Sequence, residues 1–116
     1  MDKENNRSFS VYFTEEFDKC LNQIQAFFAE QGEDVLEWWY IQEDNMIDEV
    51  DHLLSSFPYA GKRVEEGPFK GLRCLTYGKS KHRMLNYLIF YLIYEEERII
   101  DVINILPSRS KRKRIR

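Results

Sequence analysis

Residues 86–109 read NYLIFYLIYEEERIIDVINILPSR, and this stretch decides the fold. Residues 87–94 carry apolar or aromatic side chains at every position, so both faces of an extended chain are apolar. A strand that is apolar on both faces is typical of the middle of a sheet. The break EEER predicts a hairpin turn. Residues 99–106 then pair back as the last strand, which Pro107 ends because proline cannot donate to a ladder.

The preceding sequence predicts a strand at residues 8–13, two helices, and a strand at residues 71–77. The first helix begins after Thr14, which can act as an N-cap, and ends near Gly32. The second helix covers about residues 34–56. Both helices are predicted from apolar residues at three- and four-residue spacing. The predicted stripes contain Phe17, Cys20, Leu21, Ile24, Phe27 and Phe28, and then Leu36, Trp39, Tyr40, Met46, Ile47, Val50, Leu53, Leu54 and Phe57, with Glu43 as a gap.

The order strand, helix, helix, strand, strand, strand predicts an α+β domain. Only QGE joins the helices, so we expect an antiparallel helical hairpin that packs on a small, curved, mostly antiparallel sheet. The last three strands form a meander, and Pro58 and Gly61 predict a loop that extends to Pro68. We therefore divide the chain into a disordered N-terminus (1–7), a single domain (8–110) and a basic tail (111–116).

The net charge of −3 conceals a division of charge between the two halves of the 116-residue chain. Residues 1–66 contain 5 Lys/Arg and 16 Asp/Glu, a balance of −11, whereas residues 67–116 contain 12 and 4, a balance of +8. This division predicts one acidic and one basic surface, the latter suited to a nucleic acid or an acidic partner. The candidate binding residues are Lys70, Arg73, Lys79, Lys81, Arg83, Arg109, Arg112 and Lys113.

Several classes of protein are disfavoured by the sequence. The longest uncharged apolar run, residues 85–94, is about half the length of a membrane-spanning helix, and the polar N-terminus has no hydrophobic leader segment. We therefore expect a cytoplasmic protein without a membrane segment. Cys20 and Cys74 lack a CxxC partner and are predicted to be small buried side chains. His52 has no second histidine at ligand spacing, and we expect neither a metal nor a cofactor.

Trp38, Trp39 and Tyr40 are consecutive, so they cannot all face the core of a helical hairpin. We predict that Trp39 and Tyr40 are buried and that Trp38 is exposed, where it can contact another protein.

The order of elements resembles the RelE/ParE superfamily of toxins from bacterial type II toxin-antitoxin modules. The resemblance is carried by SFPYAG after the second helix, by GLRCLTYG and NYLIFYLI in the strands, and by RIIDVINILPSR at the end; it covers about residues 8–110. It implies a curved sheet with a concave basic face and two helices packed behind it. It also implies a cognate antitoxin whose C-terminal segment wraps around the toxin, with Trp38 and Arg109 as candidate contacts. A homodimer, or a heterotetramer with the antitoxin, is a further expectation.

The superfamily contains two activities, and both remain open. RelE-like members cleave mRNA in the ribosome, and Arg83 and Arg109 are similar to the arginines of such sites, with Lys79 and Lys81 nearby. The chain has no Tyr or His after Tyr94 that could transfer a proton, and only His82 in the preceding loop could replace it. ParE-like members bind DNA gyrase and need no such group. Their helical hairpin is long, as it is predicted to be here, so we favour this activity.

A third possibility is an RNA-binding module without toxicity, or a toxin that has lost its activity. In such a module, the basic segments would hold phosphates and Tyr77, Tyr87 and Tyr91 would stack on bases. This interpretation is weakened by the prediction that the central-strand aromatics are covered on both faces.

Overall fold

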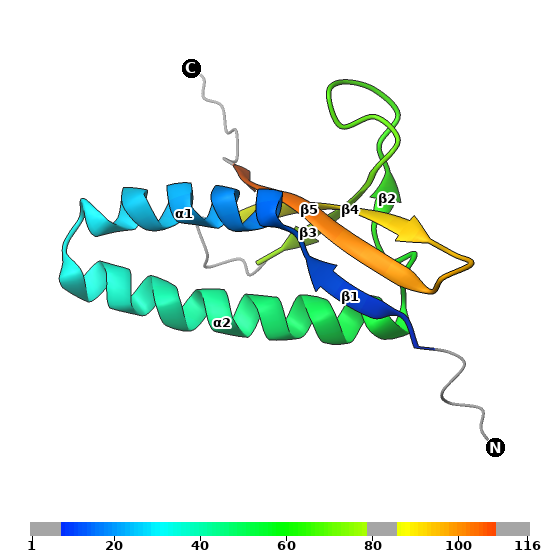
Figure 1. The fold of residues 1–116 in the computed structure, drawn as a ribbon. Helices are drawn as coiled ribbons and strands as arrows, with labels where there is room; N and C mark the ends of the chain where they lie inside the picture. Colours follow the sequence, from blue (N-terminus) through cyan, green and yellow to red (C-terminus); the bar gives the residue numbers. More distant parts are fainter. Residues whose placement is uncertain (1–7, 79–85, 109–116) are drawn as a thin grey trace.

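The computed structural model describes residues 8–78 and 86–108, and it confirms the predicted α+β fold (Figure 1). The predicted N-terminal segment and basic tail lie outside these residues. The elements are β1 (Ser10–Phe13), α1 (Glu15–Ala29), α2 (Glu33–Ser56), β2 (Lys62–Arg63), β3 (Arg73–Tyr77), β4 (Asn86–Tyr94) and β5 (Ile99–Ser108).

The sheet has five strands in the order β1-β5-β4-β3-β2. As predicted, β4 is central, and β3, β4 and β5 form an antiparallel meander. The N-terminal strand β1 runs parallel to β5, with Ser10 to Phe13 opposite Ile99 to Val102. The sheet is therefore mixed.

Two predictions about the ends of elements were wrong. Lys62 and Arg63 form the short strand β2 within the predicted loop, because they pair with Cys74 and Arg73. Strand β5 continues through Pro107 to Ser108 instead of ending before proline. The reason is that β1 pairs with β5 only as far as Val102, so Pro107 has a strand on one side only and lies in an edge position.

A bulge in β5 explains how its apolar residues reach the core. Phe90 pairs with Asn104 whereas Tyr91 pairs with Val102, which leaves Ile103 as an extra residue. An extra residue reverses the alternation of side chains along a strand. Val102 and Ile105 can therefore both be buried although they are three positions apart.

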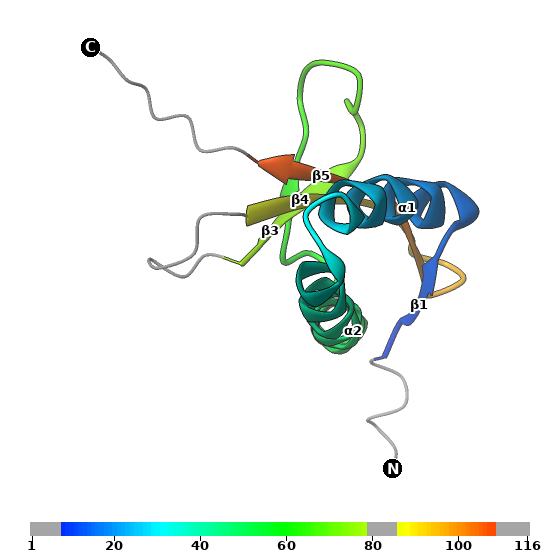
Figure 2. The ribbon, with the colours of Figure 1, turned by 90° about the vertical axis from the view of Figure 1, so that its left-hand side faces the viewer.

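Both helices lie on one side of the sheet, and the loop between β2 and β3 lies on the other (Figure 2). Thr14 fixes the start of α1, because its Oγ1 accepts a hydrogen bond from the Phe17 amide (3.2 Å) and donates one to the Val102 carbonyl (3.1 Å). The core contains four residues of each predicted stripe, together with residues on the inner face of β4 and β5. Its members are Phe17, Leu21, Ile24, Phe28, Trp39, Met46, Val50, Leu54, Tyr87, Ile89, Tyr91, Ile100, Val102 and Ile105.

Three aromatic residues of the predicted stripes are exposed instead of buried. Phe27 is 55%, Tyr40 46% and Phe57 64% exposed. Phe27 precedes the buried Phe28 and Tyr40 follows the buried Trp39, and consecutive side chains on a helix point about 100° apart. Phe57 lies after the last residue of α2. The core takes Phe28 and Trp39 and leaves their neighbours outside.

Glu43, the gap in the second stripe, has a structural role. Its Oε1 accepts hydrogen bonds from the Trp39 indole N–H (2.9 Å) and the Gln25 side-chain amide (2.8 Å). The carboxylate therefore satisfies the polar atom of a buried tryptophan and links α1 to α2.

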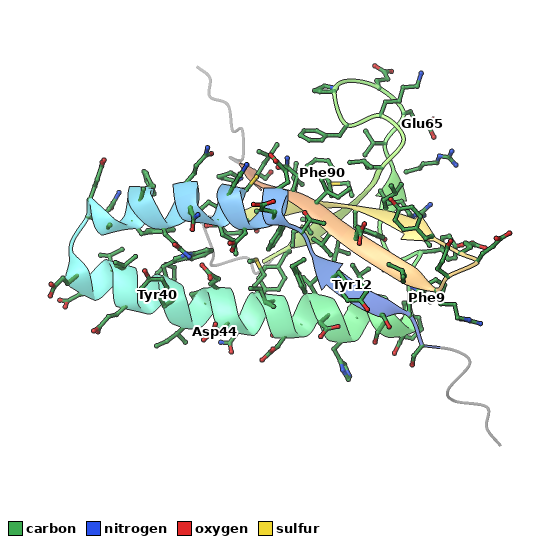
Figure 3. All side chains as sticks on the ribbon, viewed as in Figure 1. Phe9, Tyr12, Tyr40, Asp44, Glu65 and Phe90 are labelled. Carbon is green, nitrogen blue, oxygen red and sulfur yellow. The ribbon has the colours of Figure 1, made fainter. Side chains whose placement is uncertain are left out.

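The opposite face of the sheet is covered at its centre by an aromatic pair. Phe90 and the loop residue Glu65 lie on the side away from α2 (Figure 3). The ring of Phe69, in the same loop, stacks on Phe90 with 4.1 Å between centroids. Both faces of β4 are therefore covered, as its sequence predicts.

Tyr91 holds the loop after α2 in place. Its hydroxyl donates to the Pro58 carbonyl (2.9 Å) and accepts from the Gly61 amide (2.8 Å). We expect Tyr91→Phe to lower the free energy of unfolding by about 1–3 kcal/mol, because the buried Gly61 amide and the partly buried Pro58 carbonyl lose their partner. Chemical denaturation measures this loss, and Tyr94→Phe, at an exposed site on the same strand, is the matched control. An unchanged midpoint for Tyr91→Phe would contradict the assigned role.

Candidate interaction surface

The two basic segments attach to the same end of the sheet. Tyr77 pairs with Tyr87, and Asn86 pairs with Ser108, so the end of β3, the start of β4 and the end of β5 are adjacent. The chain enters residues 79–85 just after β3 and residues 109–116 just after β5. The candidates in these segments lie outside the described residues: Lys79, Lys81, His82, Arg83, Arg109, Arg112 and Lys113.

The two described cationic candidates differ in their surroundings. Lys70 is exposed in the loop that carries Phe69. Arg73 is partly buried, and its Nε and Nη2 donate to the Gly61 carbonyl at 3.1 and 2.7 Å. Its guanidinium also lies 5.1 Å from the centroid of the Tyr59 ring. Arg73 therefore stabilises the loop after α2, a role that its sequence position did not predict.

The described part of the chain is strongly acidic. Residues 8–78 and 86–108 contain 18 Asp/Glu and 6 Lys/Arg, a formal charge of −12. The helical hairpin, residues 15–56, contains 12 of these acids and a single cation, Lys19, a formal charge of −11. The acidic surface predicted from the first half of the chain is therefore the surface of the helical hairpin.

An apolar groove separates α1 from the end of β5. Its volume is about 320 Å³. The α1 side is formed by Cys20, Gln23, Ile24, Phe27 and Phe28, and the sheet side by Tyr87, Ile105, Leu106 and Pro107. The groove exists because β1 ends beside Val102, after which α1 occupies the flank of β5.

A series of ring contacts leads from this groove across the helical hairpin. Phe27 contacts Phe28 (centroids 5.2 Å apart), and Phe28 contacts Trp38 (5.8 Å), both edge to face. Trp38 is exposed, as predicted, with 44% of its surface accessible. Ile41, 60% exposed, follows Trp38 at the spacing of neighbours on one helix face. Exposed apolar side chains therefore lie on both helices, joined beneath the surface by the buried ring of Phe28.

The two cysteines are half-buried and not fully buried as predicted. The Cys20 thiol lines the groove and donates to Asn104 Oδ1 at 3.3 Å. Burial raises the pKa of the Cys74 thiol, an effect that a backbone hydrogen bond with Ile89 partly offsets. The neutral thiol is therefore the form that the sheet favours at Cys74.

The tyrosines proposed to stack on bases are not available for that role on β4. Tyr87 and Tyr91 are buried in the core, and Tyr77 packs against it. The sequence did not predict the groove or the position of Phe27 on its rim. The adjacent pair Phe27–Phe28 was the available indication, since only one of two consecutive residues can face the core.

The described residues contain no group of three or more His, Cys, Asp or Glu placed to bind a metal ion. Neither described helix is long and apolar enough to cross a bilayer. No protein-family model and no curated protein matches this chain.

Proposed function

We propose that this chain is the toxin of a type II toxin-antitoxin module, which acts in the bacterial cytoplasm by inhibiting DNA gyrase and is neutralised by a cognate antitoxin. The observation that carries the proposal is the β-α-α-β-β-β arrangement, to which the two-residue strand β2 is added. In it, α1 and α2, of 15 and 24 residues, back a meander of β3, β4 and β5. This is the fold that the RelE/ParE resemblance implies. The long helical hairpin is the feature that favours ParE-like action.

The face of the sheet away from the helices also favours a toxin that acts by binding gyrase over one that cleaves RNA. Ribose 2′-OH attack on the neighbouring phosphate needs cations beside the phosphate and a group that transfers protons. In the described ranges, the centre of this face holds the stacked pair Phe69 and Phe90 instead. Phe90 is 5% exposed beneath Phe69, so a packed aromatic pair, and not a charged side chain, occupies the centre of this face.

The second candidate is a RelE-like endoribonuclease that cleaves mRNA in the ribosome. It is favoured by the attachment of both basic segments to one end of the sheet, beside Asn86 and Ser108. Arg83, Arg109 and His82 would then supply the charge stabilisation and proton transfer.

Expression of the full chain in a gyrase-sensitive bacterium distinguishes these activities. We expect growth arrest with an SOS response and intact mRNA, because trapped gyrase leaves broken DNA. Cleavage of mRNA at codon positions in translating ribosomes, without an SOS response, would establish the second candidate. Harmless expression at a high level, with no small protein that binds the chain and is encoded beside it, would favour the non-toxic RNA-binding module or a toxin that has lost its activity.

We expect the double substitution Arg83→Ala and Arg109→Ala to abolish growth arrest or antitoxin binding, because each removes a cation from a basic segment. We expect the free energy of unfolding to change by less than about 0.5 kcal/mol, because the sequence predicts both arginines outside the core, where substitutions usually have small effects. Colony counts after induction and thermal melting measure the two effects. Lys19→Ala, which removes an exposed cation from α1, is the matched control and should remain toxic. Loss of folding in the double variant would instead make these arginines structural.

A further inference from the structure

The exposed apolar surface of the helical hairpin has the properties of a docking site. It consists of the groove between α1 and β5, the rim residues Phe27 and Leu106, and the neighbouring pair Trp38 and Ile41 on α2; we call this set the hairpin strip. Its two halves are joined beneath the surface, because the buried ring of Phe28 contacts the rings of both Phe27 and Trp38. The groove lies where α1 faces the end of β5, and Trp38 and Ile41 lie in the first turns of α2. The turn that joins the helices extends past the sheet (Figure 1).

The charge around the hairpin strip limits the kind of partner that fits it. Asp34, Glu37 and Asp44 lie three or four residues from Trp38 or Ile41, which is the spacing of neighbours on a helix, and all three are exposed. Glu30 and Glu33 flank the turn between the helices. Across the whole hairpin the formal charge is −11. The electric field of this negative charge attracts cationic partners and repels acidic ones.

We propose that the hairpin strip binds a cationic amphipathic helix of another protein. Apolar side chains on one face of that helix would occupy the groove and cover Trp38 and Ile41. Lys and Arg side chains on its borders would face the carboxylates of α1 and α2. An amphipathic helix fits because it presents anchors at three- and four-residue spacing to an apolar groove. This inference goes beyond the proposed function and does not depend on toxicity.

Binding of two synthetic peptides of about 18 residues to the full chain tests this proposal. Both peptides place leucine at helical spacing on one face. All remaining positions are lysine in one peptide and glutamate in the other. By fluorescence anisotropy, we expect the lysine peptide to bind at least about tenfold more tightly than the glutamate peptide. The difference should shrink at high salt, where charges are screened. Equal or tighter binding of the glutamate peptide would overturn the proposal.

Variants of the chain separate specific docking from general attraction to an acidic protein. The double variant Trp38→Ala, Ile41→Ala should bind the lysine peptide at least about tenfold more weakly. The reason is that truncation of an exposed tryptophan removes a typical interface anchor. Tyr94→Ala removes an exposed aromatic ring at the other end of β4 and should leave the affinity unchanged. Thermal melting checks that the variants are folded.

The remaining outcomes would contradict the proposal. If the lysine peptide binds the double variant as tightly as it binds the natural chain, its binding is electrostatic only. If sedimentation shows that the natural chain is a dimer and that the double variant is a monomer, the hairpin strip binds a second copy of this chain instead.

Discussion

Replacing Gly61 by alanine is expected to lower the free energy of unfolding by about 3 kcal/mol, the upper end of the usual cost of overpacking. An added Cβ would lie 2.5 Å from the carbonyl oxygen of Cys74 and 2.8 Å from its carbonyl carbon. It would also lie 2.9 Å from the Tyr91 hydroxyl. The first two atoms belong to the backbone of β3 and cannot move without disturbing the sheet. Chemical denaturation should therefore give a much lower midpoint.

The loss of stability in Gly61→Ala is increased because the backbone of Gly61 also makes three hydrogen bonds. Its amide donates to Tyr91, and its carbonyl accepts two bonds from Arg73. A backbone shift that relieves the overlap would weaken these bonds. Ala60→Ser adds one heavy atom at the neighbouring exposed residue and is the matched control, expected to change stability by less than about 0.5 kcal/mol. Equal midpoints for the two variants would show that this loop does not pack closely on β3.

Replacing Trp39 by alanine is expected to lower the free energy of unfolding by about 3–5 kcal/mol. The side chain is 2% exposed and fills the space between the helices and the sheet. Its ring stacks on Phe28 (centroids 5.2 Å apart) and packs against Tyr87 (5.6 Å). The substitution would leave a cavity among these rings and would remove one hydrogen bond from Glu43.

Trp38→Ala, one residue earlier, is the control for this prediction. It removes the same number of atoms from a partly exposed position and should cost no more than about half as much, because 44% of the Trp38 surface is already accessible to water, compared with 2% for Trp39. Thermal melting of the two variants measures the contrast. Similar losses at both positions would mean that the orientation of α2 differs from the one described.

The main features of the fold could be predicted because they depend on local patterns. The apolar faces of residues 87–94 identified the central strand, and Thr14 followed by two glutamates identified the start of α1. The three-residue link between the helices required an antiparallel hairpin. Each of these conclusions uses residues that are close in sequence, where spacing determines geometry.

The errors occur where distant segments meet. Strand β2 exists only because the far edge of β3 lies beside Lys62 and Arg63, and Pro107 stays in β5 only because β1 ends at Val102. Phe27 and Tyr40 were assigned to the core because a periodic stripe does not say which of two consecutive aromatic residues faces inward. That choice depends on the surface against which the helix packs.

The candidate site was predicted in part. The division of charge identified the acidic hairpin and the two basic segments, because net charge is a property of composition alone. Arg73 was predicted to bind a target, yet it donates to the carbonyl of Gly61, 12 residues earlier in the chain. The groove beside Phe27 and Leu106 was not predicted, since its two walls come from α1 and β5.

The sequence by itself determined the order of the elements, the antiparallel helical hairpin, the central position of β4 and the opposite charges of the two halves. Only the tertiary structure decided the parallel pairing of β1 with β5, the bulge at Ile103 and the position of the hairpin strip. The physical reason is the range of the interactions. Periodicity and charge act along the chain, whereas the register between strands and the closure of a groove depend on contacts between residues far apart in sequence.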